Sequence, residues 1–253
     1  MIKPKNTSWE QSGKWYNKIV GTKGHYFHEN IILPNVLKLL NLQKDSTLLD
    51  IGCGQGILAK KIPPFIEYAG IDLAKNLINF AKQSDKNPKH TYFITDATKP
   101  LPLGNRIFSH AAAILALQNM ENASLAIKQV ALRLQNKGKF VIVLNHPCFR
   151  IPKQSGWGIW KNITQYRYIN DYMSPLKIPI TMHPGDNPSE ITWTFHQPLS
   201  YYAQSLKANG FLIESIEEWI SNKTSQGPAA RMENRARAEF PLFLAISAQR
   251  ISL

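Results

Sequence analysis

The sequence predicts an α/β protein with a doubly wound, mostly parallel sheet. Short apolar runs alternate with helical patterns from residue 45 to residue 145. These runs are apolar without interruption, as is typical of parallel strands covered by helices on both faces. Acidic residues and glycines follow directly on several of the runs, where such a sheet carries its connecting loops. Right-handed crossovers between the strands then follow from the geometry of the fold.

The first half of the chain supplies the parallel part of the sheet. Residues 25–42 carry apolar residues at helical spacing interrupted by Pro34, which predicts one helix or two short ones. Strands are expected at 46–51, 67–73, 90–98, 108–117 and 139–145. Helices are expected at 57–62, 74–84 and 122–138, the last of them ending at a glycine cap, Gly138.

The regular alternation stops at Asn145. Residues 146–196 are rich in Pro, Gly, Trp and Tyr and show no long helical period. Within them, residues 177–198 predict two strands around a Gly-Asp-Asn-Pro turn. Residues 199–219 predict a helix and a strand, and residues 240–250 a last strand. Residues 220–240 form a polar excursion that is longer than an ordinary connection and therefore of functional interest.

The bulk composition excludes some classes of protein and leaves others open. The 253 residues carry a net charge of +13, which is compatible with a nucleic-acid partner. The excess positive charge, however, consists mostly of lysines scattered singly along the first half of the chain. We therefore regard a nucleic-acid partner as the weaker alternative. No apolar run reaches transmembrane length and the first residues lack a leader pattern, so we expect no membrane span and a cytoplasmic location. Two cysteines provide no disulfide framework and, by themselves, no metal site.

Three acidic residues are expected to line one crevice with a glycine-rich turn. Asp50 precedes the turn "GCGQG", and Asp72 and Asp96 end the next two strands. The carboxyl ends of parallel strands meet at one edge of the sheet, which is where ligands bind in such folds. Asp50 suits an ammonium group, Asp72 the two hydroxyls of a ribose, and Asp96 an adenine amine. The glycine spacing differs from the dinucleotide fingerprint, so the ligand is expected to carry no phosphate.

These segments resemble the class I S-adenosylmethionine-dependent methyltransferases. The resemblance lies in "LLDIGCGQG", "GIDLAKNLI", "ITDATKPLPL" and "AILALQNM", which span about residues 45–145. It implies a Rossmann-like, seven-stranded sheet with an antiparallel last strand, and S-adenosylmethionine as the cofactor. One departure is His110, which stands where the family commonly has an acid at strand four. The residues expected to bind the cofactor are Asp50, Gly52, Cys53, Gly54, Gly56, Asp72, Leu73, Asp96, Ala97, Ile114 and Leu115.

The resemblance also divides the chain into parts of a single methyltransferase domain, residues 1–253. Residues 1–44 are expected to form an N-terminal helical lid and residues 45–145 the cofactor-binding core. Residues 146–196 are expected to be a cap inserted after strand five, on the substrate side. Residues 197–253 complete the core with a helix and two strands. The oligomeric state is left open.

The stretch "NHPCFRIP" follows the fifth strand and is expected at the same edge of the sheet as the acids. His146 is the first candidate for a general base, with a role in holding the cap as the alternative. His25 with Tyr26 is the second candidate. A Cys–His catalytic pair formed by Cys148 and His146 is the weaker interpretation, and no metal is expected.

The acceptor is expected to be a small molecule, methylated at an O, N or C atom. Aromatic residues in the cap favour a planar or lipophilic acceptor, although they serve equally well as the core of the insertion. Asn145, Arg150, His183 and Trp193 are the candidate substrate-binding residues. The alternatives are an RNA or protein methyltransferase and a non-catalytic module that only binds S-adenosylmethionine.

Overall fold

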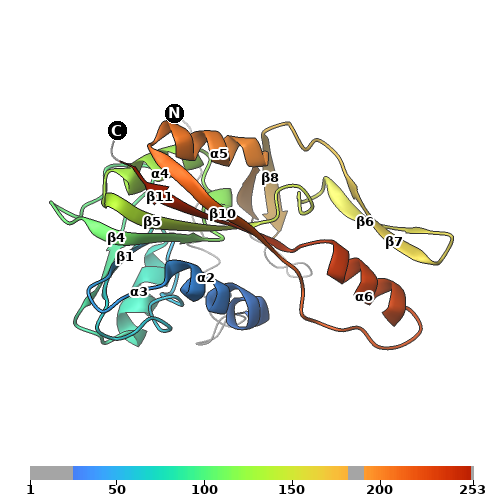
Figure 1. The fold of residues 1–253 in the computed structure, drawn as a ribbon, viewed down its shortest axis with the longest axis horizontal. Helices are drawn as coiled ribbons and strands as arrows, with labels where there is room; N and C mark the ends of the chain where they lie inside the picture. Colours follow the sequence, from blue (N-terminus) through green and yellow to red (C-terminus); the bar gives the residue numbers. More distant parts are fainter. Residues whose placement is uncertain (1–24, 182–190, 252–253) are drawn as a thin grey trace.

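The computed structural model describes residues 25–181 and 191–251. Its centre is a seven-stranded sheet in the order β10-β11-β5-β4-β1-β2-β3 (Figure 1). The strands are β1 (Thr47–Ile51), β2 (Glu67–Asp72), β3 (His90–Ile94), β4 (Phe108–Ile114), β5 (Leu134–Asn145), β10 (Phe211–Trp219) and β11 (Phe243–Arg250). Strands β1 to β5 pair in parallel, and β11 runs antiparallel to both β5 and β10. The predicted fold class, including the antiparallel last strand, is confirmed.

Alternate residues of the strands enter two separate cores, one on each face of the sheet. In β5, Phe140 and Ile142 pack with helices α4 (Ala123–Ala131) and α5 (Leu199–Ala208), whereas Val141 and Val143 pack on the opposite face. That second core includes α2 (Leu33–Leu40), α3 (Lys75–Ser84) and the π-helical turn η1 (His28–Ile32). The period of two that separates these side chains is that of an extended strand. Figure 1 shows the two groups of helices on opposite sides of the sheet.

The predicted helix over residues 122–138 is wrong in its second half. Helix α4 ends at Ala131, and β5 begins at Leu134, whose partner on β4 is Phe108. The pairing register then shifts, so that His110 lies opposite Lys139. Gly138 belongs to this irregularity: a Cβ there would lie 2.9 Å from the Gln135 carbonyl oxygen. The glycine marks a bulge in a strand and does not cap a helix.

The predicted helix over residues 57–62 is also wrong. This segment forms turns in which the Lys60 N–H donates to the Gly56 carbonyl and the Ile62 N–H to the Leu58 carbonyl. By contrast, the helical pattern over residues 25–42 is confirmed as two short segments, η1 and α2. Pro34 is the second residue of α2, which directly follows the π-helical turn η1.

The segment between β5 and α5 contains two hairpins. One was not predicted: β6 (Ser155–Trp160) pairs with β7 (Thr164–Ile169). The second hairpin was predicted: β8 (Leu176–Thr181) pairs with β9 (Ile191–His196). The predicted turn between these two strands lies outside the described residues. The polar excursion after β10 contains an unpredicted helix, α6 (Ala230–Glu239). None of the helices described is both long enough and apolar enough to cross a lipid bilayer.

The strand order places a topological switch point between β1 and β4. From β1 the chain continues through β2 and β3 in one direction, and β4 then lies on the other side of β1. Loops that leave neighbouring strands in opposite directions open a crevice at their carboxyl ends, which is where open α/β sheets bind ligands. The turn after β1 and the segment after β4 meet at this point.

Candidate functional site

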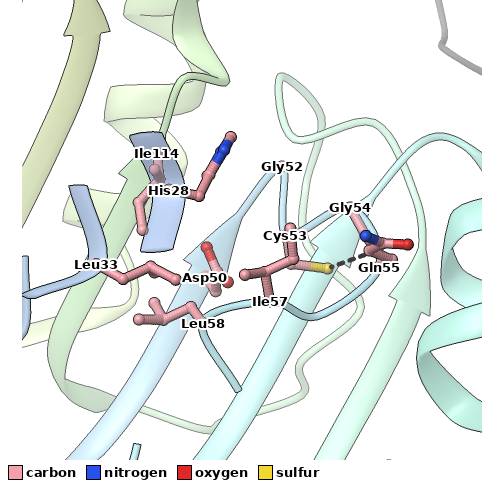
Figure 2. Close-up of a pocket in the computed structure, with 10 residues that line it drawn as sticks. All are labelled: His28, Leu33, Asp50, Gly52, Cys53, Gly54, Gln55, Ile57, Leu58 and Ile114. Atoms are coloured by element: carbon pink, nitrogen blue, oxygen red, sulfur yellow. Dashed lines mark hydrogen bonds between the residues drawn. The ribbon is translucent and has the colours of Figure 1, made fainter. Parts of the chain in front are cut away.

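Two adjoining cavities open at the switch point. The larger has a volume of about 1080 Å³ and the smaller about 60 Å³. Both are lined by His28, Gly52, Gly54 and Ile114, so the smaller is a recess of the larger. Figure 2 shows the lining of the recess around Asp50 and the glycine turn. Small-molecule sites commonly have volumes of about 300–1,000 Å³, so the larger cavity has room for more than one ligand.

The backbone of the glycine turn is already hydrogen-bonded within the protein. The N–H groups of Gly52 and Cys53 both donate to the Ile71 carbonyl, at 2.7 and 3.0 Å. The Gly54 N–H donates to Oδ2 of Asp72 at 2.9 Å. A phosphate site needs free N–H groups or the start of a helix. The N–H groups of Gly52, Cys53 and Gly54 already have acceptors within the protein and are not available to a phosphate.

The three glycines of the turn have different surroundings. All have positive φ angles, of 69° at Gly52, 54° at Gly54 and 74° at Gly56. A Cβ at Gly52 would overlap the side chain of Ala116, and one at Gly56 would lie 2.8 Å from the Tyr92 hydroxyl. A Cβ at Gly54 would meet only a Leu77 methyl, at 4.0 Å. Gly54 thus presents its backbone to the cavity, while Gly56 lines neither cavity and serves packing.

Asp50 lies in the recess and is 2% exposed. The Tyr68 hydroxyl donates to its Oδ2 at 2.7 Å. Burial raises the pKa of Asp50 to about 7; the Tyr68 hydrogen bond opposes this rise, and the charge of Asp72 adds to it. A buried carboxyl of this kind ionises readily when a cation arrives beside it. Burial likewise raises the pKa of the Cys53 thiol, which keeps Cys53 in its uncharged form.

Asp72 and Asp96 both line the larger cavity. Asp72 accepts from the N–H groups of Gly54 and Ala74, at 2.9 and 2.8 Å, which fixes its carboxylate at the end of β2. Asp96 accepts from the N–H and the hydroxyl of Thr98, at 2.9 and 2.7 Å. Leu73, Ala97, Ile114 and Leu115 join them in the lining. The structure thus brings together the predicted cofactor residues except Gly56, with Asp50 and Cys53 in the recess.

The predicted catalytic residues do not all face the cavities. His146 is 1% exposed, lines neither cavity, and its Nε2 lies 2.7 Å from a carboxylate oxygen of Glu218. Its Nδ1 accepts from the Cys148 N–H at 3.2 Å. These contacts favour the alternative role, that of holding the segment after β5. The Cys148 thiol is directed to the Tyr172 hydroxyl, at 3.4 Å, so nothing pairs it with His146 as a nucleophile.

Among the N-terminal candidates, His25 lines the larger cavity, whereas Tyr26 does not and lies beneath the Lys223 ammonium, 4.5 Å from its ring centroid. His28 lines both cavities. Its Nδ1 is buried and has no hydrogen-bond partner among the described residues. Burial and the neighbouring His25 lower the pKa of His28 to about 4, so His28 is neutral at physiological pH.

Some of the predicted substrate-binding residues line the larger cavity and others do not. Asn145 lines the larger cavity, but Arg150 and Trp193 do not. On β9 the residues on either side of Trp193, Thr192 and Thr194, face the cavity, and the alternation of a strand therefore turns Trp193 away. Instead its ring lies 5.3 Å from the Lys177 ammonium. His183 lies outside the described residues.

Sequence reasoning missed the wall opposite the three aspartates. Gln118 connects β5 and β9 in this wall by two hydrogen bonds. Its side-chain oxygen accepts a hydrogen bond from the Asn145 N–H at 2.8 Å, and its backbone carbonyl accepts one from the Thr194 hydroxyl at 3.0 Å. Asn119, Asn122 and Thr192 also line this part of the cavity. The Thr192 hydroxyl is buried and has no hydrogen-bond partner among the described residues. The alternation of side chains along β9 was the only feature of the sequence that could have indicated the threonines. No local pattern showed which set of alternating side chains would face the cavity.

Comparison with known proteins agrees with this geometry. Residues 49–142, which include the glycine turn and all three aspartates, match the family described as "Methyltransferase domain". Residues 49–142 are thus similar to methyltransferase domains, as the resemblance to the class I S-adenosylmethionine-dependent methyltransferases predicts. S-adenosylmethionine fits the site, because it carries no phosphate and the N–H groups of Gly52, Cys53 and Gly54 already have acceptors. The nearly buried carboxyl of Asp50, in the recess that Gly54 also lines, can pair with the ammonium group.

The similarity extends to individual proteins. An uncharacterized methyltransferase of Schizosaccharomyces pombe is 30% identical over 117 residues, and a demethylmenaquinone methyltransferase of Bacillus licheniformis is 26% identical over 109 residues. These alignments cover 44% and 42% of this chain, and 44% and 47% of the relatives, so the chain spans about half of their length. A methyltransferase structure from Mesorhizobium loti shares the fold, with a TM-score of 0.67 and 23% identity over 86% of this chain and 96% of that one.

Proposed function

We propose that this protein transfers the methyl group of S-adenosylmethionine to a small-molecule acceptor bound in the larger cavity. The observation that carries the proposal is the extent of that cavity. It reaches from Asp72 and Asp96 on one side to Asn145 and β9 on the other, with a volume of about 1080 Å³. A cofactor held by the aspartates leaves the opposite wall for a second ligand.

The protein's own groups account for binding of the cofactor. Asp50 accepts the ammonium group in the recess, Asp72 the ribose hydroxyls, and Asp96 the adenine amine, while the Gly54 backbone allows close approach. The bound cofactor supplies an electrophilic methyl group on a sulfonium. The chain therefore has to hold the acceptor atom in line and exclude water, which is a demand on positioning more than on chemistry.

The composition of the opposite wall bears on the class of acceptor. The aromatic side chains of the β6–β7 hairpin and Trp193 do not line the cavity, so they give no support to an aromatic acceptor. The wall instead presents the amide and hydroxyl side chains of Gln118, Asn119, Asn122, Thr192 and Thr194, together with the Glu121 carboxylate and the apolar side chains of Met120, Leu125 and Ile180. We propose an acceptor that carries hydrogen-bonding groups next to the reacting atom.

The two N-terminal histidines take different roles in this proposal. His25 stands at the exposed rim of the larger cavity and is the candidate that removes a proton from the acceptor. His28 is held neutral by burial and is too weak a base for that task at neutral pH. Its unpaired Nδ1 is a positioning group for a bound ligand. A neutral imidazole also avoids repulsion of a sulfonium.

A labelled-methyl assay tests the proposal. The protein is incubated with S-adenosylmethionine labelled in the methyl group and with a cell extract separated into small-molecule, lipid, RNA and protein pools. We expect label in the small-molecule or lipid pool, and much less label at low cofactor concentration when Asp72→Ala replaces the wild type. Label confined to RNA or protein would overturn the proposed acceptor class. Cofactor binding without labelling of any pool would favour a non-catalytic module.

A further inference from the structure

The β6–β7 hairpin projects from the body of the molecule and exposes large apolar side chains. Figure 1 shows it extending away from the central sheet beside α6. At its tip, Trp160 is 58% exposed and Ile163 is 71% exposed, and Ile159 nearby is 55% exposed. Exposed isoleucines and tryptophans gathered at the end of a projecting hairpin commonly mark a surface that meets another apolar phase.

The base of the hairpin is fixed to the body by one of its two faces. Trp157 packs edge-on against Phe240, with ring centroids 5.4 Å apart, and the Arg167 guanidinium lies 4.9 Å from the centre of the Trp157 ring. Arg167 also donates to the Phe149 carbonyl at 2.7 Å and to the Ser155 hydroxyl at 2.9 Å. A two-stranded hairpin alone is marginally stable, so these contacts hold its orientation.

The other face of the hairpin is an open aromatic plate, formed by Trp160, Tyr166 and Tyr168. Gly156 pairs with Tyr168 and Gly158 with Tyr166, and a Cβ at either glycine would overlap the tyrosine ring opposite. The glycines therefore let both tyrosine rings lie flat against the backbone. Tyr166 and Tyr168 remain 45% and 54% exposed. Trp and Tyr are the side chains that concentrate at the boundary between membrane and water.

The charged residues of the segment that forms the hairpin have one sign. Residues 146–170 contain Arg150, Lys153, Lys161 and Arg167 but no Asp or Glu. The Lys161 ammonium lies 4.5 Å from the centre of the Trp160 ring, at the tip itself. Basic side chains next to exposed aromatic and aliphatic ones complement an anionic lipid surface.

We propose that the β6–β7 hairpin docks this protein on the interface of an anionic membrane. Trp160 and Ile163 enter the headgroup region, the tyrosines lie at its boundary, and Lys161 meets anionic headgroups. Two exposed isoleucines near the tip, Ile159 and Ile163, favour lipid over nucleic acid as the partner. Nucleic-acid bases stack on aromatic rings, but isoleucines at a tip gain nothing from them.

The base of the hairpin lies close to the larger cavity, but the docking surface at its tip does not depend on what the cavity binds. Pro152 lines the larger cavity and Ser155 begins β6, so only two residues separate them. The proposal concerns binding to the surface alone, and a failure of the proposed methyl transfer leaves it intact.

Vesicle sedimentation tests the proposal with the full chain. Vesicles of phosphatidylcholine alone are compared with vesicles that also contain phosphatidylglycerol, at low and at physiological salt. We expect binding to the anionic vesicles, weakened by salt. The double variant Trp160→Ser/Ile163→Ser should lower the partition coefficient at least about tenfold, because it removes the apolar area that enters the interface. Lys161→Gln should lower it about fivefold.

A matched control exchanges the same kind of exposed side chain elsewhere. Ile107 and Leu132 are 51% and 59% exposed and lie next to the amino ends of β4 and β5, so Ile107→Ser/Leu132→Ser should bind vesicles as the wild type does. Circular dichroism should show all variants folded. Equal loss of binding in both double variants, or no binding to anionic vesicles by the wild type, would overturn the proposal. Binding of single-stranded RNA that is lost only in the tip variant, without vesicle binding, would assign the surface to RNA instead.

Discussion

The Tyr68 hydroxyl donates a hydrogen bond of 2.7 Å to Oδ2 of Asp50, and both side chains are buried beneath the glycine turn. This bond stabilises the ionised carboxylate against the burial that raises the pKa of Asp50 to about 7. Asp50 therefore changes its charge close to neutral pH. The ligand group expected beside it is an ammonium, which prefers the ionised form.

The first prediction is that affinity for S-adenosylmethionine rises with pH through about 7, as Asp50 loses its proton. It should decline above about pH 8, where an α-amino group loses its own proton. Tyr68→Phe removes a hydrogen bond to the carboxylate and should move the rising limb up by about one pH unit. Calorimetric titration on both sides of pH 7 measures the profile.

Asp50→Asn is the control for this profile, because it has no carboxyl to titrate. At about pH 7.5 this variant should bind the cofactor more weakly than the wild type, and its affinity should no longer rise with pH through about 7. A rising limb that persists in Asp50→Asn would assign the titration to another group. Equal affinity in Asp50→Asn and the wild type would remove Asp50 from the ammonium site.

The second prediction concerns Asp72, whose two oxygens accept from the Gly54 and Ala74 N–H groups. Asp72→Ala should raise the Kd for the cofactor at least about tenfold and lower the free energy of unfolding by about 1–3 kcal/mol, since it leaves two N–H groups without their acceptor. Calorimetry and urea unfolding measure the two effects.

Asp85 provides a matched carboxylate for that comparison. Its Oδ2 accepts from the Tyr92 hydroxyl at 2.5 Å and lies 2.6 Å from Nδ1 of His90, and it lines neither cavity. Asp85→Ala should lower stability by a similar amount and leave the Kd unchanged. If both variants changed the Kd equally, the effect of Asp72 would be one of general stability and not of contact with the ligand.

The third prediction separates two glycines of the same turn. Gly52→Ala forces a Cβ into the side chain of Ala116 and should destabilise the fold by about 2 kcal/mol or more. Gly54→Ala meets open space and should cost only about 1 kcal/mol, for its positive φ. Because that space is the cavity, Gly54→Ala should nevertheless weaken cofactor binding clearly. Thermal unfolding with calorimetry distinguishes the two; equal losses of stability would contradict this assignment.

The parts of the site that sequence reasoning found depend on local patterns. Continuous apolar strands predicted the parallel sheet, and Asp50, Asp72 and Asp96 each stand at or just after the end of such a strand. The sheet then brings them to one edge whatever the rest of the chain does. The antiparallel β11 followed from the family resemblance, because its own sequence does not encode strand direction.

The predictions were wrong where contacts with residues distant in the sequence determine the orientation of a side chain or the secondary structure of a segment. His146 follows a strand as the aspartates do, but Glu218, 72 residues away, turns it from the cavity. Leu134 continues the apolar period of α4, yet pairing with Phe108 takes it into β5. In β6, two glycines leave space for tyrosines of β7, so the alternation typical of a strand is hidden in the sequence.

The fourth prediction tests the wall for the acceptor. Thr192 is 4% exposed, lines the larger cavity, and its hydroxyl has no hydrogen-bond partner among the described residues. Thr192→Val keeps the shape and removes the hydroxyl. It should raise the KM for the acceptor about tenfold, by the loss of one hydrogen bond, and leave the cofactor Kd unchanged. Trp193→Phe, on the opposite face of β9, should change neither constant; a Kd that moves with Thr192→Val would place Thr192 on the cofactor side.

The last prediction contrasts His28, which lines both cavities, with the buried His146. His28→Leu removes an unpaired polar atom from the cavity lining, so it should hold or raise the free energy of unfolding while lowering turnover about tenfold or more. His146→Leu breaks the contacts with Glu218 and the Cys148 N–H and should cost about 1–3 kcal/mol, with turnover per folded molecule nearly unchanged.

The pH dependence of stability adds a second readout for His28. Burial and the neighbouring His25 lower its pKa from the ordinary histidine value of 6.5 to about 4, so the unfolded chain takes up the proton first. The stability that neutral His28 contributes is complete above about pH 6.5 and is lost as the pH falls toward 4. His28→Leu should therefore lose less stability than the wild type over this range. If His28→Leu instead unfolded more readily at every pH while its turnover stayed intact, His28 would be a structural residue and the unpaired Nδ1 would have no part in positioning a ligand.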